Sequence, residues 1–248
     1  MKEWIVGRNP VYEVLRAGRR HVFRLLAARG VEDKGHLAEI FKLAPQRRLK
    51  VEWVSRPQLD GLGENHQGVA LEASGYPYGA LADILALAQK LQQPLFVLAL
   101  DVLQDPQNLG TLLRTAEAAG VHGVLMPLRR AAGVTPAVVS ASAGACEHLL
   151  VAPVNLAQGL TALKEAGAWV VGLDVDPQAQ PLAQVRLDGP LVLVVGSEGE
   201  GMRALVRRSC DLLAYLPIQG KVQSLNAAVA GSIALYVALQ ARLAKRTG

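Results

Sequence analysis

The sequence is poor in cysteine, which excludes two common ways of stabilising a fold. Its 248 residues include only Cys146 and Cys210, too far apart in the chain to form a C-x-x-C pair. Neither a disulfide framework nor a structural zinc site is therefore expected. The five histidines include no pair at the spacing of metal ligands, so we expect no metal cofactor.

Long apolar stretches and two catalytic patterns are missing as well. No apolar run approaches the ~20 residues of a membrane-spanning helix, and residues 1–4 lack the apolar stretch of a signal peptide. The expected location is therefore the cytoplasm. The chain has no G-x-x-x-x-G-K-S/T phosphate loop and no G-x-S-x-G nucleophile elbow. These absences argue against a P-loop nucleotide hydrolase and against a serine hydrolase.

What the sequence does have is a large apolar fraction and a modest positive charge. Hydrophobic residues make up 51% of the chain, enough to bury a substantial core, and the net charge is +5. The positive excess lies in the first third. Residues 1–75 carry 13 Lys and Arg against 9 Asp and Glu, whereas residues 93–248 carry 12 against 11. Any one of these side chains is typical of a solvated surface, but together they favour a polyanionic partner.

The order of strands and helices divides the chain into two α/β parts. The first part opens on a helix at 9–17, for which we expect Asn9 as N-cap and Pro10 at the first helical position. A strand, a helix and two further strands follow, at residues 22–27, 33–43, 51–54 and 68–73. A turn-rich stretch and a helix separate this part from the rest. The predicted domains are residues 1–75, a linker at 76–92, and residues 93–248.

Strands and helices alternate through the second part. The expected strands are residues 96–100, 123–126, 169–173, 191–195 and 212–216, and the expected helices are residues 108–119, 136–146, 156–166, 202–210 and 225–245. The runs 96–100 and 191–195 are apolar throughout, which is typical of strands buried on both faces. We therefore predict an α/β fold with a mostly parallel sheet between helical layers. Ligands of such sheets bind beyond the carboxyl ends of the strands.

Three motifs rich in small and polar residues follow the ends of predicted strands. The first is DPQNLG at 105–110, followed by Arg114; the second is GSEGEG at 196–201. The third is LPIQG at 216–220, followed by Ser-Leu-Asn at 224–226. Because the carboxyl ends of parallel strands meet at one edge of a sheet, we expect the three motifs to form one composite site.

The glycine-rich second motif superficially matches a dinucleotide-binding loop. Residues 199–204 read G-x-G-x-x-A, but the preceding strand ends at Val195, so the first glycine comes late. Glu198 and Glu200 would face a pyrophosphate, and no acidic residue follows about 20 positions later. The loop therefore suits a ligand that is cationic or rich in hydrogen-bond donors. We interpret Glu198 as functional and Glu200 as a solvated turn residue.

The polar residues of the other two motifs each have a structural and a functional interpretation. Asn108 could be a helix N-cap, and Arg114 could be an exposed side chain of an otherwise leucine-rich helix. Alternatively, Arg114 grips a phosphate with both edges of its guanidinium. Ser224 also has two interpretations. It either caps the last helix or binds a phosphate through its hydroxyl at the start of that helix.

Taken together, the three motifs closely resemble those of the SpoU/TrmH family of RNA ribose 2′-O-methyltransferases in the knotted SPOUT superfamily. Residues 7–11 (GRNPV) and 66–70 (HQGVA) resemble the small RNA-binding domain, similar to a ribosomal L30e protein, of the bacterial ribosomal-RNA branch. The resemblance implies a C-terminal trefoil knot, S-adenosylmethionine as methyl donor, and a homodimer. It also implies ribosomal RNA as the partner, with a guanosine of 23S RNA as the target.

The resemblance also implies roles for eight residues. Backbone groups of Gly196, Leu216 and Leu225 would hold the donor. Among the five catalytic candidates, Arg114 would activate the 2′-hydroxyl, and Asn108 and Glu198 would orient Arg114. Ser224 would bind phosphate, and Asn226 would shape the knot loop.

Four other functions remain open at this point. A transfer-RNA ribose methyltransferase would carry the same catalytic motifs, and so would a resistance methyltransferase acting on ribosomal RNA. A purely RNA-binding relative should lack Arg114 or Asn108, and this chain has both. The case for a nicotinamide dehydrogenase rests only on the G-x-G-x-x-A match at residues 199–204, whose first glycine comes late.

Overall fold

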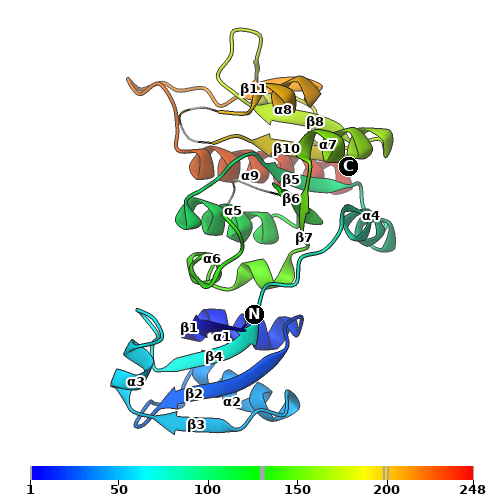
Figure 1. The fold of residues 1–248 in the computed structure, drawn as a ribbon. Helices are drawn as coiled ribbons and strands as arrows, with labels where there is room; N and C mark the ends of the chain where they lie inside the picture. Colours follow the sequence, from blue (N-terminus) through cyan, green and yellow to red (C-terminus); the bar gives the residue numbers. More distant parts are fainter. Residues whose placement is uncertain (1, 129–131, 198, 200, 248) are drawn as a thin grey trace. The chain divides into compact units, whose positions relative to one another are not determined.

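The computed structural model describes residues 2–128, 132–197, 199 and 201–247, and side chains only as far as residue 245. The chain forms two compact units, drawn in Figure 1. The first contains residues 1–77 and 133–148; the second contains residues 78–132 and 149–248. The sequence indicated a simple division near residue 75. It did not indicate that a segment from the middle of the chain joins the first unit.

The first unit is built on a four-stranded sheet with the order β1-β4-β2-β3. The pairs β1–β4 and β4–β2 are antiparallel, and β2–β3 is parallel. The strands are β1 (Lys2–Val6), β2 (Val22–Ala28), β3 (Val51–Val54) and β4 (Val69–Ser74). The helical segments are α1 (Arg8–Ala17), α2 (His36–Gln46), α3 (Arg56–Asp60), α6 (Pro136–Ala141) and the 3₁₀ turn η1 (Ala145–His148). β1 and α3 were not predicted, and the helix expected at 136–146 is divided into α6 and η1.

The start of α1 differs from the sequence-based expectation. The N-cap is Gly7, with φ 97°, and not Asn9, which lies inside the helix. The Asn9 side chain instead makes a 2.7 Å hydrogen bond with Nδ1 of His36. A positive φ is strained for residues other than glycine. Glycine therefore occupies this N-cap position in place of the usual polar residue.

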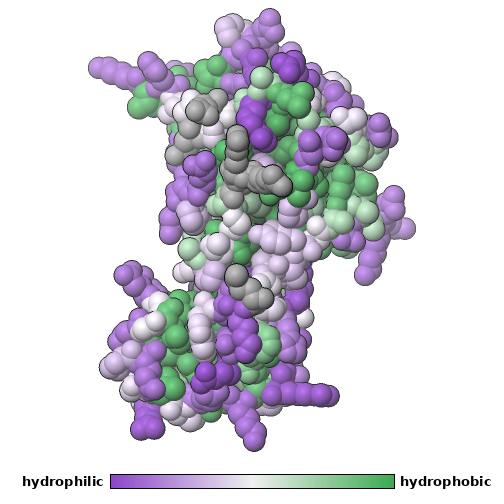
Figure 2. Space-filling model, viewed as in Figure 1, coloured by the Kyte–Doolittle hydropathy of each residue, from purple (hydrophilic) through white to green (hydrophobic). Residues whose placement is uncertain are grey.

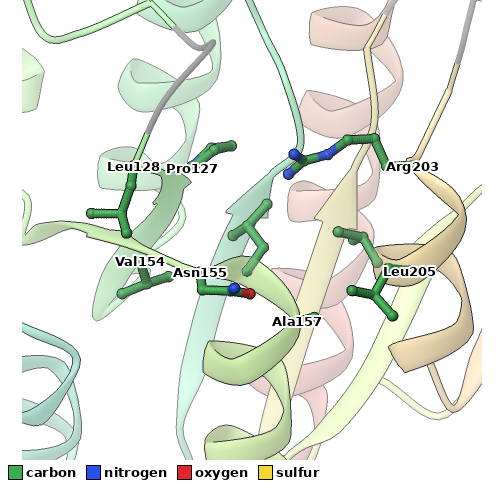
Figure 3. Close-up of a pocket in the computed structure, with 9 residues that line it drawn as sticks. Pro127, Leu128, Val154, Asn155, Ala157, Arg203 and Leu205 are labelled. Atoms are coloured by element: carbon green, nitrogen blue, oxygen red, sulfur yellow. The ribbon is translucent and has the colours of Figure 1, made fainter.

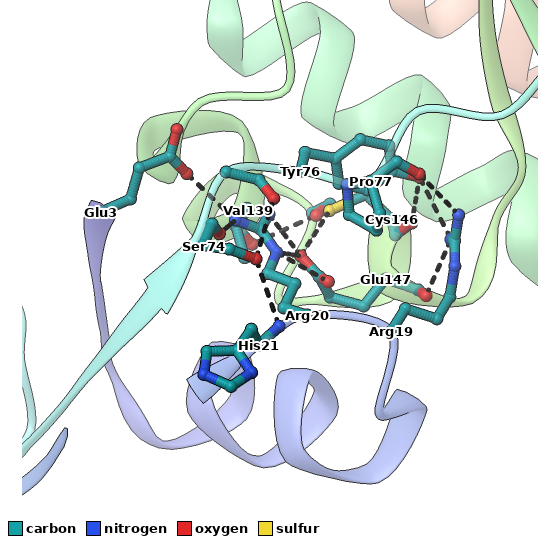
Figure 4. A network of polar contacts seen from close by, with 12 residues as sticks. Glu3, Arg19, Arg20, His21, Ser74, Tyr76, Pro77, Val139, Cys146 and Glu147 are labelled. Carbon is teal, nitrogen blue, oxygen red and sulfur yellow. Dashed lines mark hydrogen bonds and ion pairs between the residues drawn. The ribbon is translucent and has the colours of Figure 1, made fainter. Parts of the chain in front are cut away.

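A buried ion pair ties residues 133–148 to the first unit, as Figure 4 shows. Arg20 Nη2 lies 2.7 Å from Oε1 of Glu147, and both side chains are essentially inaccessible to solvent. The same guanidinium contacts Glu3 at 3.0 Å and donates to the backbone oxygen of Ser74. Nearby, the Tyr76 hydroxyl donates to the backbone oxygen of Cys146. These contacts explain why η1 belongs to this unit.

Replacing Arg20 with alanine is expected to destabilise the first unit strongly. The change leaves the Glu147 carboxylate buried without its cation, which typically costs about 3–5 kcal/mol. Urea unfolding measures the loss. The matched control is Arg24→Ala, because the Arg24–Glu52 pair is half exposed on both sides and such pairs contribute at most about 1 kcal/mol. Equal losses for the two variants would contradict the assigned role of the buried pair.

The second unit contains a seven-stranded sheet in which every pairing is parallel. Its order is β7-β6-β5-β10-β8-β11-β9. The strands are β5 (Phe96–Leu100), β6 (Gly123–Pro127), β7 (Val151–Val154), β8 (Trp169–Leu173), β9 (Gln180–Pro181), β10 (Leu191–Val195) and β11 (Leu212–Tyr215). The predicted parallel sheet is confirmed. The sequence missed β7 and β9, two edge strands that each contain a proline, which an edge position tolerates.

Helices cover both faces of this sheet (Figure 1). α4 (Leu81–Lys90), α7 (Leu156–Glu165) and α8 (Ala204–Ser209) pack over one face, where their apolar side chains join Val192 and Val194 of β10 in one core. α5 (Pro106–Ala118) and α9 (Ala227–Thr247) cover the other face, and a short 3₁₀ turn, η2 (Leu182–Gln184), precedes β10. The trefoil knot implied by the resemblance stays a prediction.

By length and composition alone, α9 is apolar enough to cross a membrane over Ala227–Lys245. The expectation that no stretch of the chain reaches this length was wrong. The helix nevertheless packs closely inside the second unit. A Cβ atom on Gly231 would lie 2.6 Å from Cδ2 of Leu112 in α5 and 3.0 Å from Cγ2 of Val195 in β10. One face of α9 therefore lies against both α5 and the sheet.

Candidate functional site

The second and third motifs meet in a cavity of about 620 Å³ beyond the carboxyl ends of β8, β10 and β11. Five of the eight predicted site residues line it: Gly196, Leu216, Ser224, Leu225 and Asn226. We call this space the donor cavity. Its other lining residues include Leu173, Asp174, Ser197, Tyr215 and Ile218, none of which was predicted as a site residue.

A tight turn after β10 forms one wall of the donor cavity. Ser197 and Gly201 exchange backbone hydrogen bonds of 3.0 and 3.1 Å, so the chain reverses immediately after Gly196. A Cβ atom on the buried Gly196 would lie 2.4 Å from the backbone carbon of Gly201 and 2.5 Å from the nitrogen of Met202. Only glycine fits there. Glu198, predicted to be functional, and Glu200, predicted to be solvated, lie outside the described residues.

The first and third motifs are joined by a hydrogen bond between two asparagines. Nδ2 of Asn226 donates to Oδ1 of Asn108 at 3.2 Å, and Oδ1 of Asn226 accepts from the backbone nitrogen of Val229. Asn226 therefore caps α9, which begins one residue later. The alternative interpretation of Ser224 as the N-cap was wrong, although Ser224 remains exposed on the cavity wall.

Capping of α5 also differs from the interpretation offered for Asn108. Asp105 is the N-cap, since its carboxylate accepts a 3.1 Å hydrogen bond from the nitrogen of Gln107, and Pro106 occupies the first helical position. Asn108 lies inside the first turn, where its side chain reaches the third motif. The capping interpretation of Asn108 was therefore wrong, and its contact with Asn226 brings α5 to the edge of the donor cavity.

Arg114 is exposed on α5 and is not among the residues that line the donor cavity of its own chain. Within the described part of the chain, no hydrogen bond or ion pair involves its guanidinium. The next residue, Thr115, shares a 3.0 Å hydrogen bond with Ser232, which fixes α5 to α9 at this level. Arg114 is thus a cation held on a rigid helix and available to a ligand.

Asp174 is the one carboxylate among the described residues of the cavity wall. It follows β8 directly, and its Oδ2 accepts a 2.8 Å hydrogen bond from Nε of Arg207. The hydrogen bond that Arg207 donates to Asp174 contributes most to raising the pKa of Arg207 above its ordinary value. The sequence carried a local signal for Asp174, because it is the first polar residue after a buried strand.

The walls of the donor cavity define the kind of ligand that it can hold. Leu216, Ile218 and Leu225 supply apolar surface, and the glycine turn supplies backbone donors and acceptors. The Asp174 carboxylate adds a negative charge. Ligand pockets typically measure ~300–1,000 Å³, so the volume suits a nucleoside-sized molecule. The residues present therefore fit a nucleoside that carries a positive charge.

The described residues contain no cluster of three or more His, Cys, Asp or Glu side chains that could hold a metal ion. The two cysteines are also unsuited to nucleophilic chemistry. Burial raises the pKa of both thiols, Cys146 and Cys210, to about 12. Because the thiolate is the reactive form, both side chains are inert near neutral pH.

Comparison with known proteins gives consistent matches over nearly the whole chain. The model of the SpoU rRNA methylase family matches residues 95–236. A second model, RNA 2′-O ribose methyltransferase substrate binding, matches residues 4–79. A Bacillus subtilis protein, YacO, named as a TrmH family tRNA/rRNA methyltransferase, is 41% identical over 236 residues, which are 94% of each chain.

Solved structures show the same fold. The SpoU methyltransferase AviRb from Streptomyces viridochromogenes superposes with a TM-score of 0.81 at 25% identity, covering 100% of this chain and 92% of that one. A second crystal structure of AviRb, in complex with the cofactor AdoMet (S-adenosylmethionine), gives a TM-score of 0.80 at 24% identity over 98% of this chain and 91% of that one.

Proposed function

The chain belongs to the SpoU methylase family of RNA methyltransferases, and from this premise we propose that it transfers a methyl group from S-adenosylmethionine to a ribose 2′-hydroxyl of RNA. The observation that carries the proposal is the donor cavity, which brings the second and third motifs together. The Asn108–Asn226 hydrogen bond attaches the first motif to its edge.

The proposed target is a guanosine of 23S ribosomal RNA. Two observations support a substrate RNA that extends beyond the active site. A substrate-binding family model covers residues 4–79, and the same region carries the excess of Lys and Arg. The names of the curated relatives include both tRNA and rRNA. Transfer RNA, or a ribosomal site linked to antibiotic resistance, is therefore the alternative target.

We also propose that the protein acts in the cytoplasm.

Binding of the donor falls to the walls of the donor cavity. When bound, S-adenosylmethionine supplies a methyl group on a sulfonium cation, so the protein need not supply a strong electrophile. The backbone at Gly196, Leu216 and Leu225 holds the nucleoside part, and Asp174 favours the positive charge. Holding the two reactants in line can contribute as much as ~7–11 kcal/mol to catalysis.

The ribose hydroxyl must lose its proton to the protein as its oxygen receives the methyl group. We assign this step to Arg114. A guanidinium is protonated near neutral pH and must give up a proton before it can accept one. An RNA phosphate bound to Arg114 by two hydrogen bonds takes up one guanidinium proton, and the neutral guanidine that remains accepts the proton of the 2′-hydroxyl. Ser224 holds phosphate at the cavity wall, and Asn108, in the first turn of α5, orients Arg114. A second role, as a phosphate clamp only, predicts a different response to Arg114→Lys.

A homodimer completes the proposed site. Four apolar side chains repeat along the solvent-facing side of α9 at helical spacing: Val229, Ile233, Tyr236 and Leu243, each 42–47% exposed. Such a stripe is typical of a helix that packs against a partner. Because Arg114 does not line the cavity of its own chain, pairing of two copies allows Arg114 of one copy to face the donor cavity of the other.

Ile233→Asp is expected to convert the dimer to monomers and to abolish methyl transfer, because a carboxylate would be buried at the proposed interface. Light scattering reports the mass, and calorimetry reports whether the donor still binds. Leu91→Asp is the matched control, since Leu91 is 48% exposed at the end of α4. A monomeric wild type, or a fully active Ile233→Asp monomer, would contradict the dimer.

Transfer of tritiated methyl groups to unmodified RNA tests the proposed function. Total ribosomal RNA and total transfer RNA, both from cells lacking this protein, are incubated separately with the wild type and labelled donor. The expected result is label in 23S RNA as 2′-O-methylguanosine and none in transfer RNA. Label only in transfer RNA would establish the alternative target. Label in neither RNA would contradict the proposal.

A further inference from the structure

A second cavity, of about 590 Å³, opens at the same edge of the parallel sheet as the donor cavity. Figure 3 shows the segments of the chain that form it. Pro127 and Leu128 come from the end of β6, Val154 and Asn155 from the junction of β7 and α7, and Arg203 and Leu205 from the start of α8. We call it the β6–α8 cavity. None of its residues belongs to the three motifs.

Two large apolar side chains in the walls of the β6–α8 cavity are unusually exposed to solvent. Leu128 and Leu205 are 66% and 56% exposed, among the highest values for large apolar side chains of the described residues. Figure 2 shows hydrophobic residues at the surface of the second unit over α7 and α8. Both leucines line the hollow together with Val154, so a flat apolar ligand would meet apolar side chains there. Exposed apolar groups gathered around a hollow are typical of a binding groove.

Arg203 is held over this cavity by a fully buried carboxylate. Asp101 follows β5 and accepts 2.8 Å hydrogen bonds from the backbone nitrogen and from Nε of Arg203, and Nη2 of Arg203 lies 2.6 Å from Oδ1. The Asp101 side chain is inaccessible to solvent, whereas that of Arg203 remains 50% exposed. One edge of the guanidinium is therefore fixed by Asp101, and its remaining donors point away from that contact.

Asn155 gives the cavity a second oriented polar group. Its Oδ1 accepts a 3.3 Å hydrogen bond from the backbone nitrogen of Gln158 and so caps α7. The cap fixes the amide plane and leaves the Nδ2 group as a donor at the cavity wall. Apolar walls with two oriented donors match the chemistry of a nucleobase, which has flat faces and carbonyl or ring-nitrogen acceptors at its edge.

A third hollow shares wall residues with both the donor cavity and the β6–α8 cavity. Ser197 and Gly201 line both this hollow and the donor cavity, and Arg203 lines both this hollow and the β6–α8 cavity. Val102, on the same hollow, has φ 59°, a strained conformation for a β-branched residue and one that is found mainly at functional sites. The carboxyl ends of β10 and β6 lie two strands apart in the sheet, which is about twice the strand spacing of ~4.8 Å.

We propose that the β6–α8 cavity binds an unstacked RNA base next to the methylated ribose. The proposal rests on the proposed function, because a ribose at the donor cavity places its neighbouring nucleotides along the same edge of the sheet. Leu128 and Leu205 pack against the faces of the base, and Arg203 and Asn155 donate to its edge. The small volume of the cavity favours a base over a protein partner, since stable protein interfaces bury ~1,200–2,000 Å² in total.

The double variant Leu128→Ser/Leu205→Ser tests this subsite, with Leu91→Ser as the matched control. Both changes lie at exposed positions, so the fold should be retained. Removing the apolar area that two leucine side chains bury against a base is expected to weaken binding about tenfold or more. We therefore expect kcat/KM for the RNA that the wild type methylates to fall at least about tenfold. Donor affinity by calorimetry and dimer mass by light scattering should be unchanged, and the control should stay within about twofold.

A photoreactive benzoylphenylalanine in place of Leu205 gives an independent readout with unmodified ribosomal RNA. The expected crosslink falls within one or two nucleotides of the methylated ribose. Wild-type kcat/KM in the double variant would overturn the subsite. A double variant that loses activity only because it is no longer a dimer would also overturn it. A crosslink without any methyl transfer by the wild type would refute the proposed function and leave RNA binding at this cavity supported. Absence of a crosslink would overturn the subsite.

Discussion

Replacing Arg114 with alanine is expected to lower the rate of methyl transfer by about 10²–10⁴-fold, the usual contribution of a positioned acid–base group. Fold and donor affinity should not change, because Arg114 is exposed and does not line the donor cavity of its own chain. Single-turnover transfer of labelled methyl groups measures the rate, and calorimetry measures donor binding. Arg186→Ala is the control, since Arg186 is an exposed arginine of the same unit, paired with Asp188.

Arg114→Lys separates the two roles of the guanidinium. Lysine keeps the positive charge but cannot bind phosphate with two parallel hydrogen bonds. If Arg114 is the proton acceptor held by phosphate, the rate should fall nearly as far as in Arg114→Ala. If it is only a clamp, the loss should appear mainly in KM for RNA. A lysine variant with the wild-type rate and KM would rule out both roles.

Gly196→Ala is expected to remove donor binding. The added Cβ would lie 2.4–2.5 Å from backbone atoms of Gly201 and Met202. No flexible side chain can move to relieve this contact, so the turn that forms the cavity wall must shift. Overpacking of this kind typically costs about 1–3 kcal/mol or more, and we expect donor affinity to fall at least about thirtyfold, equivalent to ~2 kcal/mol.

Gly189→Ala is the matched control for this prediction. A Cβ on Gly189 would meet no atom within 4 Å, and its backbone does not adopt a positive φ. Calorimetric titration with S-adenosylmethionine should therefore give the wild-type affinity for Gly189→Ala. Thermal unfolding of both variants distinguishes local loss of the donor cavity from loss of the fold. Wild-type donor affinity in a folded Gly196→Ala protein would contradict the role of the glycine turn.

Features that are local in sequence could be predicted. The continuous apolar runs of β5 and β10 indicated strands buried on both faces, and the structure places them side by side in a fully parallel sheet. Gly196, Leu216 and Leu225 were assigned to the donor through the family resemblance, and all three line one cavity. Asp174 could have been found by the same reasoning, because it directly follows the buried strand β8.

Features that depend on distant contacts could not be predicted. Nothing near Arg20 in the sequence indicates that its partner is Glu147, 127 residues away, and this pair carries residues 133–148 into the first unit. Helix starts were mispredicted for a different reason. Asn9, Asn108 and Ser224 all have good capping chemistry, but the caps are Gly7, Asp105 and Asn226. Each of these caps lies two or three residues from the expected one, so neighbouring residues with similar capping chemistry could not be told apart from the sequence.

The β6–α8 cavity shows the same limit at the level of a site. It is assembled from the ends of β6 and β7 and the start of α8, and each segment alone reads as an ordinary strand end or helix start. Only the fold brings Leu128 and Leu205 to one hollow. The Asp101–Arg203 pair is equally invisible in the sequence, since it spans 102 residues.

The central claim is that this chain methylates a ribose of 23S ribosomal RNA. Mass-spectrometric mapping of ribose methylation tests it most directly, in cells lacking the protein and in the same cells supplied with wild type or Arg114→Ala. The predicted result is loss of one 2′-O-methylguanosine from 23S RNA, restored by the wild type and not by Arg114→Ala. Unchanged methylation of 23S RNA, or a loss confined to transfer RNA, would contradict the claim.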